Sequence, residues 1–392
     1  MIQELASSLV SKGHDVTVIT GFPNHPSGVV FGGYRKQWSM KESIDGVKVR
    51  RMYLYTSPSV GKIKRMITFL SFTFSSAWAL LVNPRYDLIF AVFQPLSVGL
   101  TLPTIARIRR AKLVLNVQDL HPDVPIELGL ISNPLLIRVL RWVEKRGYQS
   151  ADGLAVICEQ FRRHCVQLGA KDDNVAMIPN WIDLREIEPG IRDNQFRAQL
   201  GLLSEHIVVL YAGTIGLVAG AEVVLHAAQI LQGKLPNIRF VFVGEGPAVT
   251  RLKELAIANS LTNVVFSSFQ PRAKLPEVQA IADISIVTLR RGKGRFSVPS
   301  KVLGYMAAAR PVIASVDLDS ETALLVSRAG CGEVIEPENS ASLVDAIASL
   351  AENNERRRLL GNKGRQYLED HYQKDKITGQ YIKFFEDVVR VA

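Results

Sequence analysis

The chain has 392 residues, of which 47% are hydrophobic and 21% are charged. This length exceeds what one ordinary core accommodates, and the composition excludes a disordered chain, so we expect two globular domains. The net charge is +10, with +7 in residues 1–190 and +3 in residues 191–392. The basic N-terminal half predicts an anionic partner, either a phosphorylated substrate or a membrane surface. Basic residues interleaved with aromatic ones are absent, and this argues against nucleic acid.

The cysteines exclude two further classes. Cys158, Cys165 and Cys331 are odd in number, far apart and without the spacing of metal ligands. We therefore expect reduced thiols and no metal site. Because the chain opens on an amphipathic helix and not on a signal peptide, we expect a cytoplasmic protein.

The first elements suggest a doubly wound domain that lacks its first strand. Residues 2–12 predict an amphipathic helix, and residues 15–20 predict a strand. Such a domain normally begins with a strand and a glycine-rich turn before this helix, and neither is present. The Gly/Pro-rich residues 21–34 follow the strand at the end where α/β sheets bind ligands. His25 in this loop is a candidate acceptor-side residue, although a surface histidine is the simpler interpretation.

Residues 62–82 carry a basic start followed by an apolar run of 16 residues that contains five Ser or Thr. A bilayer span needs about 20 apolar residues, so we do not expect a transmembrane helix. Two interpretations remain. The segment is either a buried helix of the first domain or an interfacial helix, with its basic residues at lipid headgroups and its aromatic residues toward the acyl chains.

The loop after the predicted strand 112–117 carries the strongest catalytic candidates of this half. It reads Gln-Asp-Leu-His-Pro-Asp and places Asp119 and His121 together at a strand end. We expect both in the active cleft. Asp123 is explained as well by capping of the helix that follows.

The second half begins after residues 184–194, a charged segment with Pro and Gly that is the best linker candidate. The apolar strand 207–213 leads into Gly213, Gly216 and Gly220. Their spacing differs from the dinucleotide pattern G-x-G-x-x-G, so NAD is not supported. A glycine-rich turn into a helix can still hold a phosphate on backbone N–H groups.

Residues 296–314 predict a loop, a helix and a buried strand. Ser300 stands at the expected N-cap, followed by Lys301, and a run of cations precedes it: Arg290, Arg291, Lys293 and Arg295. A helix N-terminus near cations attracts anions. An ordinary β-α-β unit with a basic loop is the alternative.

Five segments of the second half occur in an order that carries a resemblance: VVLYAGTIG, FVFVGEGP, SSFQP, ADISIV and VPSKVLGYMAAARPVIA. Together they resemble the C-terminal domain of family 4 retaining glycosyltransferases. In the first half, ELASSLVSKGHDVTVIT, VQDLHPD and IPNWID resemble the same family. The chain looks most like the branch that adds N-acetylated amino sugars, such as N-acetylfucosamine, to bacterial surface polysaccharides.

The resemblance implies the α/β fold called GT-B, in which two Rossmann-like domains face each other across a cleft. Residues 1–185 would bind the acceptor, residues 186–375 would bind the nucleotide-sugar, and residues 376–392 would form a helix that crosses back to the first domain. No metal or other cofactor is implied, because helix dipoles and cations stabilise the departing diphosphate in this family.

The chain also departs from the family pattern. The family carries two glutamates with seven residues between them, and these positions fall at Phe296 and Gly304. Its Arg and Lys after the first strand of the second domain fall near Thr214 and Ala219. Cations for a diphosphate would therefore come from Lys301 or the arginine-rich loop.

The expected site combines both lines of reasoning. Asp119 or His121 would orient the acceptor hydroxyl or take its proton. Phe269 would lie near the nucleobase, and Glu321 near the ribose or the sugar. The full donor-binding set is Gly213, Gly216, Glu245, Phe269, Arg290, Ser300, Lys301 and Glu321.

The expected function is transfer of a sugar, an N-acetylated amino sugar above all, from a UDP-linked donor. The expected acceptor is a polyprenyl-diphosphate-linked sugar or glycan at the inner membrane face, in O-antigen (lipopolysaccharide), capsule or exopolysaccharide synthesis. Two alternatives stay open. One is a nucleotide-sugar 2-epimerase of the same fold, and the other is a catalytically degraded scaffold.

Overall fold

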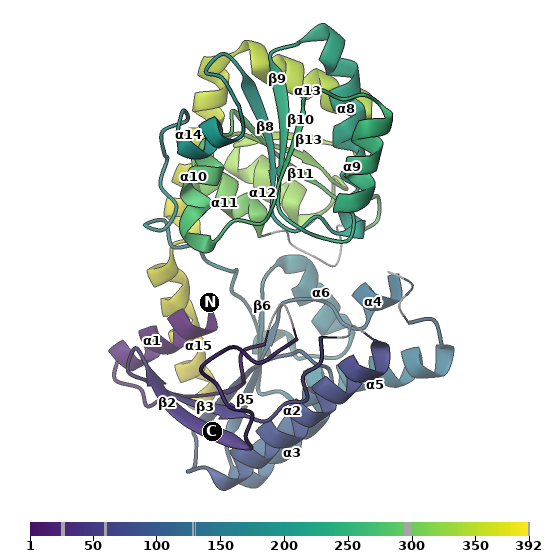
Figure 1. Cartoon of the computed structure of the whole chain (residues 1–392). Helices are drawn as coiled ribbons and strands as arrows, with labels where there is room; N and C mark the ends of the chain where they lie inside the picture. The colour runs from purple at the N-terminus through teal and green to yellow at the C-terminus, as the bar shows by residue number, and fades with distance from the viewer. Residues whose placement is uncertain (25–27, 59–60, 128, 130, 294–299, 391–392) are drawn as a thin grey trace. The chain divides into compact units, whose positions relative to one another are not determined.

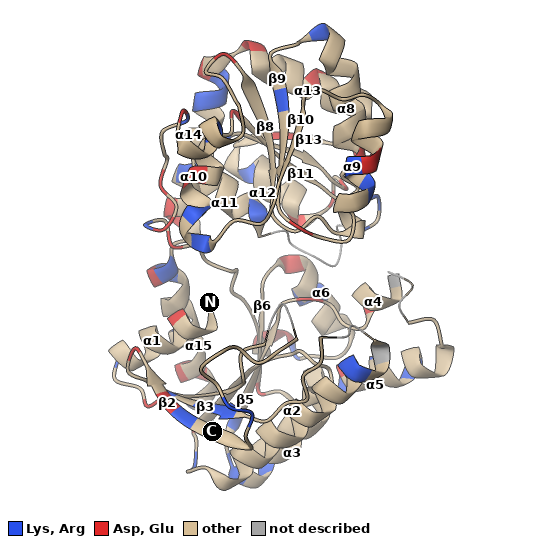
Figure 2. Cartoon of the chain, in the orientation of Figure 1, with Lys and Arg blue, Asp and Glu red and all other residues tan. Residues whose placement is uncertain are grey.

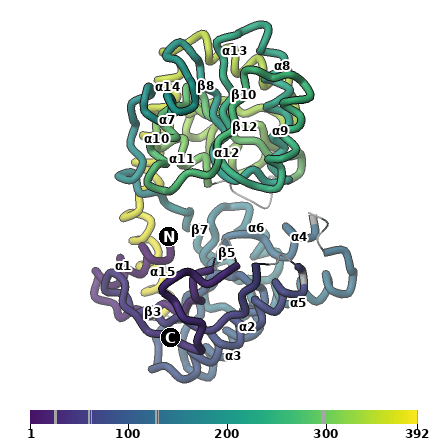
Figure 3. The backbone as a smooth tube through the Cα atoms, viewed as in Figure 1, coloured from purple at the N-terminus to yellow at the C-terminus, as the bar shows by residue number. Residues whose placement is uncertain are grey.

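The computed structural model describes residues 1–24, 28–58, 61–127, 129, 131–293 and 300–390. The chain divides into two compact units (Figures 1 and 3). Unit 1 comprises Met1–Asn180 and Asp375–Ala392, and unit 2 comprises Trp181–Lys374. Each unit alternates strands and helices, as the sequence predicts.

The strands of unit 1 form two sheets. The first has the order β1-β3-β2, with β1 parallel and β2 antiparallel to β3. The second is parallel, with the order β4-β5-β6-β7. β1 and β4 are edge strands, and no strand precedes α1 in the described part of the chain. The bounds are β1 Thr17–Gly21, β2 Ser39–Ile44, β3 Val47–Met52, β4 Leu88–Val92, β5 Lys112–Val117, β6 Gly153–Val156 and β7 Val175–Met177.

The helices of unit 1 include a side-by-side set, α2, α3 and α5 (Figure 1). α3 and α5 approach closely because both carry a glycine at the crossing. A Cβ added to Gly99 would lie 2.7 Å from the Phe93 ring and 3.5 Å from the Gly147 Cα atom. The bounds are α1 Ile2–Ser11, α2 Lys62–Val82, α3 Val98–Arg109, α4 Asp123–Glu127, α5 Pro134–Ser150, α6 Glu159–Gln167, η1 Asp172–Asn174 and α15 Lys374–Arg390.

The C-terminal helix α15 packs on the second sheet of unit 1. Its Phe385 ring lies 5.0 Å from that of Phe90 on β4. The Tyr381 hydroxyl accepts a hydrogen bond from Asn116 Nδ2 on β5 at 3.1 Å. The last helix thereby belongs to the core of the first half of the chain.

Unit 2 is built on one parallel sheet with the order β10-β9-β8-β11-β12-β13. Its strands are near-continuous apolar runs because helices cover both faces, giving two buried clusters. The strands are β8 Ile207–Ala212, β9 Ile238–Val243, β10 Val264–Ser267, β11 Ile284–Thr288, β12 Val312–Ser315 and β13 Gly332–Ile335. The helices are α7 Gln195–Gln199, η2 Leu217–Ala219, α8 Glu222–Lys234, α9 Val249–Ala258, η3 Arg272–Lys274, α10 Leu275–Ala280, α11 Lys301–Ala307, α12 Glu321–Ala329, α13 Ser340–Glu352 and α14 Asn354–His371.

Helix α2 corrects one interpretation of the sequence. Its stretch Ile63–Val82 spans 20 residues with a mean hydropathy of 1.4, long and apolar enough by these measures to cross a membrane. This stretch extends the 16-residue apolar run by Ile63, Met66 and two charged residues, Lys64 and Arg65. Only 22% of the stretch is buried, so α2 is not a buried helix of the domain core.

Candidate active site

The first group of candidate residues lies at the carboxyl ends of β4 and β5. These strands are parallel neighbours, with Val92 opposite Asn116. Asp119 and His121 follow β5, and Gln94 follows β4. The Gln94 side-chain amide contacts His121 Nε2 and also hydrogen-bonds Asp119. The structure thus brings the two predicted residues together through Gln94, which the sequence analysis missed although it stands directly after a predicted strand.

Burial shifts both titratable groups toward their neutral forms. It raises the pKa of Asp119, and the hydrogen bond from Gln94 opposes this rise. It lowers the pKa of His121, and the positive charge of Arg65 lowers it further. Raising its pKa makes the carboxylate of Asp119 a stronger base, and a neutral imidazole can accept a proton as well.

A chain of amides fixes the base of this loop. Asn180 Nδ2 donates to Gln118 Oε1 at 2.9 Å, and Gln118 Nε2 donates to Asn116 Oδ1 at 2.7 Å. Asn116 in turn donates to Tyr381 of α15. The residue just before Asp119 is therefore held by groups from three other parts of unit 1.

In unit 2, two glycine turns meet at the ends of β8 and β9. Gly213 has φ +122° and Gly244 has φ +147°, in the region that favours glycine. A Cβ on Gly244 would lie 2.0 Å from the Gly213 carbonyl oxygen, so no larger residue fits there. The Gly213 N–H donates to the Val243 carbonyl at 2.9 Å. The exposed Glu245 follows in the second turn.

Lys301, the first residue of α11, points at the end of β8. Its Nζ donates to the Tyr211 hydroxyl at 2.7 Å and to the Thr214 carbonyl at 3.3 Å, and it lies 3.9 Å from the Tyr211 ring centroid. Burial lowers the pKa of Lys301 to about 8. No carboxylate among the described residues forms an ion pair with this ammonium group, which leaves its charge available to an anion.

Tyr305 fastens α11 to the same strand. Its hydroxyl accepts from the Ala212 N–H at 2.8 Å and donates to the Ala212 carbonyl at 3.1 Å. The side chain is fully buried. Tyr305 thus fixes the end of β8 relative to Lys301, and the sequence analysis did not single it out.

Arg290 is already engaged by the protein. Its guanidinium contacts Glu222 Oε1 at 2.7 Å and Glu338 Oε1 at 3.5 Å, and it donates to the Leu217 carbonyl at 2.8 Å. Two carboxylates compensate its charge, so it stabilises η2 and the start of α8. Its role toward a donor stays a prediction, and Lys301 is the stronger candidate.

The other predicted donor residues follow successive strands of unit 2. Gly216 precedes η2 after β8, Phe269 follows β10 with its ring 63% exposed, and Ser300 is the exposed residue before α11. Glu321 opens α12 after β12, where the Ser320 hydroxyl accepts from the Ala323 N–H at 3.2 Å. Because all strands are parallel, these residues share one edge of the sheet.

Three further sequence expectations concern His25 and the two family glutamate positions, Phe296 and Gly304. His25 and Phe296 lie outside the described residues. Gly304 is buried, and a Cβ there would lie 3.4 Å from Gln279 Nε2. A side chain at the position of the second family glutamate would therefore start in contact with Gln279. In the described part of the chain, no group of three His, Cys, Asp or Glu is placed to hold a metal ion.

The two halves of the chain match two family models. Residues 1–181 match the glycosyl transferase 4-like domain, and residues 192–367 match the glycosyl transferases group 1. Among curated relatives, the Escherichia coli K12 protein named as colanic acid biosynthesis glycosyl transferase WcaI is 28% identical over 97% of this chain and 93% of its own length. The Pseudomonas aeruginosa glycosyltransferase WbjE is 25% identical over 74% of this chain and 71% of its own length.

Solved structures confirm the predicted fold. The sucrose-phosphate synthase of Thermosynechococcus elongatus superposes with a TM-score of 0.77 at 18% identity, over 100% of this chain and 93% of that one. Anabaena HepE, in complex with UDP and glucose, gives a TM-score of 0.69 at 16% identity, over 95% of this chain and 100% of that one. The chain has the GT-B fold of two Rossmann-like domains.

Proposed function

Because the chain belongs to the glycosyltransferases with a 4-like and a group 1 domain, we propose that it transfers an N-acetylated amino sugar from a UDP-sugar to a polyprenyl-diphosphate-linked acceptor, with retention at the anomeric carbon. The acceptor meets the enzyme at the inner membrane face, during synthesis of a bacterial surface polysaccharide. The amino sugar and the retention come from the sequence resemblance. The curated name of WcaI supports a polysaccharide pathway.

The observation that carries the proposal is the position of the Lys301 ammonium group. It is a cation held by Tyr211 and Thr214 at the strand-end edge of unit 2, without a carboxylate partner among the described residues. A site of this kind stabilises negative charge that develops in a transition state. The solved complexes of HepE with UDP and with UDP-glucose support a uridine diphosphate as the leaving group.

The reaction breaks the bond between the anomeric carbon and the diphosphate oxygen, and it forms a bond from that carbon to the acceptor oxygen. The electron pair of the broken bond leaves with UDP, whose new charge faces Lys301. The acceptor hydroxyl loses its proton to Asp119 or His121, whose shifted pKa values suit such a transfer.

The test is a panel of nucleotide-sugars assayed for nucleotide release, with and without a membrane-lipid extract. We expect release from one UDP-N-acetyl-amino sugar, and only when the lipid extract is present. Conversion of a donor incubated alone would instead indicate an epimerase. If no donor releases its nucleotide and none raises the melting temperature, the chain is a scaffold, because a ligand that binds the native state stabilises it.

A further inference from the structure

Helix α2 is attached to the rest of unit 1 by side-chain hydrogen bonds of its Ser and Thr residues. Ser75 is fully buried, and its hydroxyl donates to the Tyr53 carbonyl at 2.5 Å. The Tyr55 N–H donates to the Ser71 hydroxyl at 2.8 Å, and the hydroxyls of Thr73 and Ser97 lie 2.8 Å apart. These bonds fasten the helix to the segment after β3 and to the start of α3.

Away from the buried Ala79 and Leu80, α2 exposes large apolar residues. Ile63 is 71% exposed, Leu70 54%, Phe74 66% and Trp78 49%. Their spacing of seven, four and four residues places them on one stripe of the helix. A surface helix of a globular protein normally has the reverse arrangement, with its apolar stripe on the core. A stripe of this size marks a surface that contacts an apolar partner.

The neighbouring helices extend this surface. α2 packs against α3, and α3 packs against α5 (Figure 1). Their exposed sides carry further apolar residues that include Ile108, Leu135, Val139 and Trp142. All three adjacent helices therefore carry exposed apolar residues, and we call their exposed sides the helical face of unit 1.

Basic residues outnumber acidic ones in these three helices. The sequences of α2, α3 and α5 contain nine Lys or Arg and one acidic residue, Glu144. Glu144 is buried and bonds His164 Nε2 at 2.8 Å and the Tyr148 hydroxyl at 3.2 Å, so it does not offset the outer charge. Figure 2 colours the Lys and Arg positions of these helices blue.

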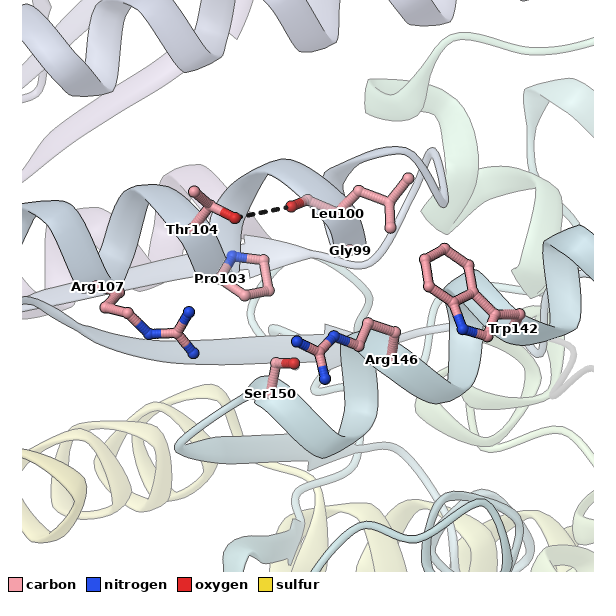
Figure 4. Close-up of a pocket in the computed structure, with 8 residues that line it drawn as sticks. All are labelled: Gly99, Leu100, Pro103, Thr104, Arg107, Trp142, Arg146 and Ser150. Carbon is pink, nitrogen blue, oxygen red and sulfur yellow. Dashed lines mark hydrogen bonds between the residues drawn. The ribbon is translucent and has the colours of Figure 1, made fainter.

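A recess between α3 and α5 concentrates two of these cations (Figure 4). Arg107 and Arg146 approach it from the two helices, with Ser150 between them and Trp142 at its other end. Neither guanidinium pairs with a carboxylate of the described residues. Two guanidinium groups beside a hydroxyl suit a phosphate oxygen, because arginine is a strong donor to phosphate.

We propose that the helical face docks on an anionic bilayer, with the α2 stripe among the acyl chains and a lipid phosphate in the recess between α3 and α5. It deepens the proposed function, on which it rests for the lipid-linked acceptor. The helix lies in the interface and does not cross the bilayer, because crossing would break the bonds of Ser71, Thr73 and Ser75. A second copy of the chain fits less well, since symmetric pairing would oppose two sets of cations.

The test measures binding to vesicles of phosphatidylcholine with or without phosphatidylglycerol. We expect wild type to bind the anionic vesicles. The double variant Ile63→Glu with Trp78→Glu should bind them at least about tenfold more weakly. Ile257→Glu is the matched control, because Ile257 is 79% exposed on α9 of unit 2; it should bind as wild type. Arg107→Ser with Arg146→Ser should lose the preference for phosphatidylglycerol.

Three results would contradict the proposed docking on a bilayer. In the first, wild type binds neither kind of vesicle, and in the second, the variants bind as tightly as wild type. In the third, the protein forms a dimer without lipid, and Ile63→Glu dissociates that dimer. Melting with and without the nucleotide-sugar shows that each variant folds and still binds its donor. If transfer proceeds but vesicles do not bind, only the face is wrong. If vesicles bind but no sugar is transferred, only the proposed function is wrong.

Discussion

The two units place different titratable groups at the carboxyl ends of their strands. In unit 1, a carboxyl and an imidazole, Asp119 and His121, share the neutral amide of Gln94. In unit 2, the ammonium group of Lys301 rests on a tyrosine and a backbone carbonyl. Burial acts on both units, because it raises the pKa of Asp119 and lowers those of His121 and Lys301.

The difference supports our proposal that the two edges do different work. A cation without a carboxylate partner holds an anion, whereas a carboxyl with an imidazole moves a proton. The surfaces differ as well, since α2 of unit 1 carries its apolar residues outward while the sheet of unit 2 is covered on both faces. This division suits an acceptor-binding unit that meets lipid and a donor-binding unit that holds a nucleotide.

The largest expected effect is that of Asp119→Asn, which removes the carboxyl from unit 1. Turnover should fall by about 10²-fold, the scale of a lost general base. UDP affinity by calorimetry should not change, because the change leaves unit 2 intact. Asp123→Asn on the same loop is the control and should lower turnover less than about twofold, since Asp123 pairs with Arg141 at 3.3 Å. Loss of UDP binding in Asp119→Asn would contradict the proposal that unit 1 transfers the proton and unit 2 binds the nucleotide.

Lys301→Ala removes the cation from unit 2. We expect turnover to fall at least about tenfold, together with a weaker affinity for UDP, because one charge contact to the diphosphate is lost. Lys274→Ala changes an exposed lysine of the same unit, which pairs with Glu277 at 2.9 Å, and should leave both quantities near wild type. Near-normal turnover in Lys301→Ala would contradict the assigned site.

The affinity for UDP should fall as the pH rises from 7 to 9. The pKa of Lys301 is about 8, so the ammonium form dominates below that pH and is lost above it. The expected loss of affinity is up to about tenfold, the fall in the ammonium fraction across this range, and calorimetry measures it. Lys301→Arg keeps its charge and should show a flatter profile. An unchanged profile in that variant would mean that another group controls binding.

The smallest expected effect concerns the attachment of helix α2 to the rest of unit 1. Ser75→Ala removes the hydrogen bond from the buried Ser75 hydroxyl to the Tyr53 carbonyl and should lower the free energy of unfolding by about 1–2 kcal/mol in urea titrations. Ser76→Ala is matched, because the Ser76 hydroxyl bonds only carbonyls of its own helix, and it should change stability by less than about 0.5 kcal/mol. If the two variants lost equal stability, the hydrogen bond from Ser75 to Tyr53 would not be what attaches α2.

Much of the site could be predicted because strand ends are a local feature of the sequence. The apolar runs before Gly213 and Asp119 locate two strand ends, and parallel pairing then gathers the loops that follow neighbouring strands at one edge. The short strand β2 was missed, since its residues Ser39–Ile44 show little apolar alternation. The pairing of Arg290 with Glu222 was missed as well, because 68 residues separate them in the chain.

The sequence by itself determined the α/β alternation, the glycine turns and the cationic stretch around Lys301, since periodicity and composition act over a few residues. The tertiary structure alone decided which of the cations keeps its charge available and which amide joins Asp119 to His121. It also decided which side of α2 faces outward. The apolar stripe of α2 predicts a contact but not its direction, and the direction follows from the partners that Ser71 and Ser75 find in other segments.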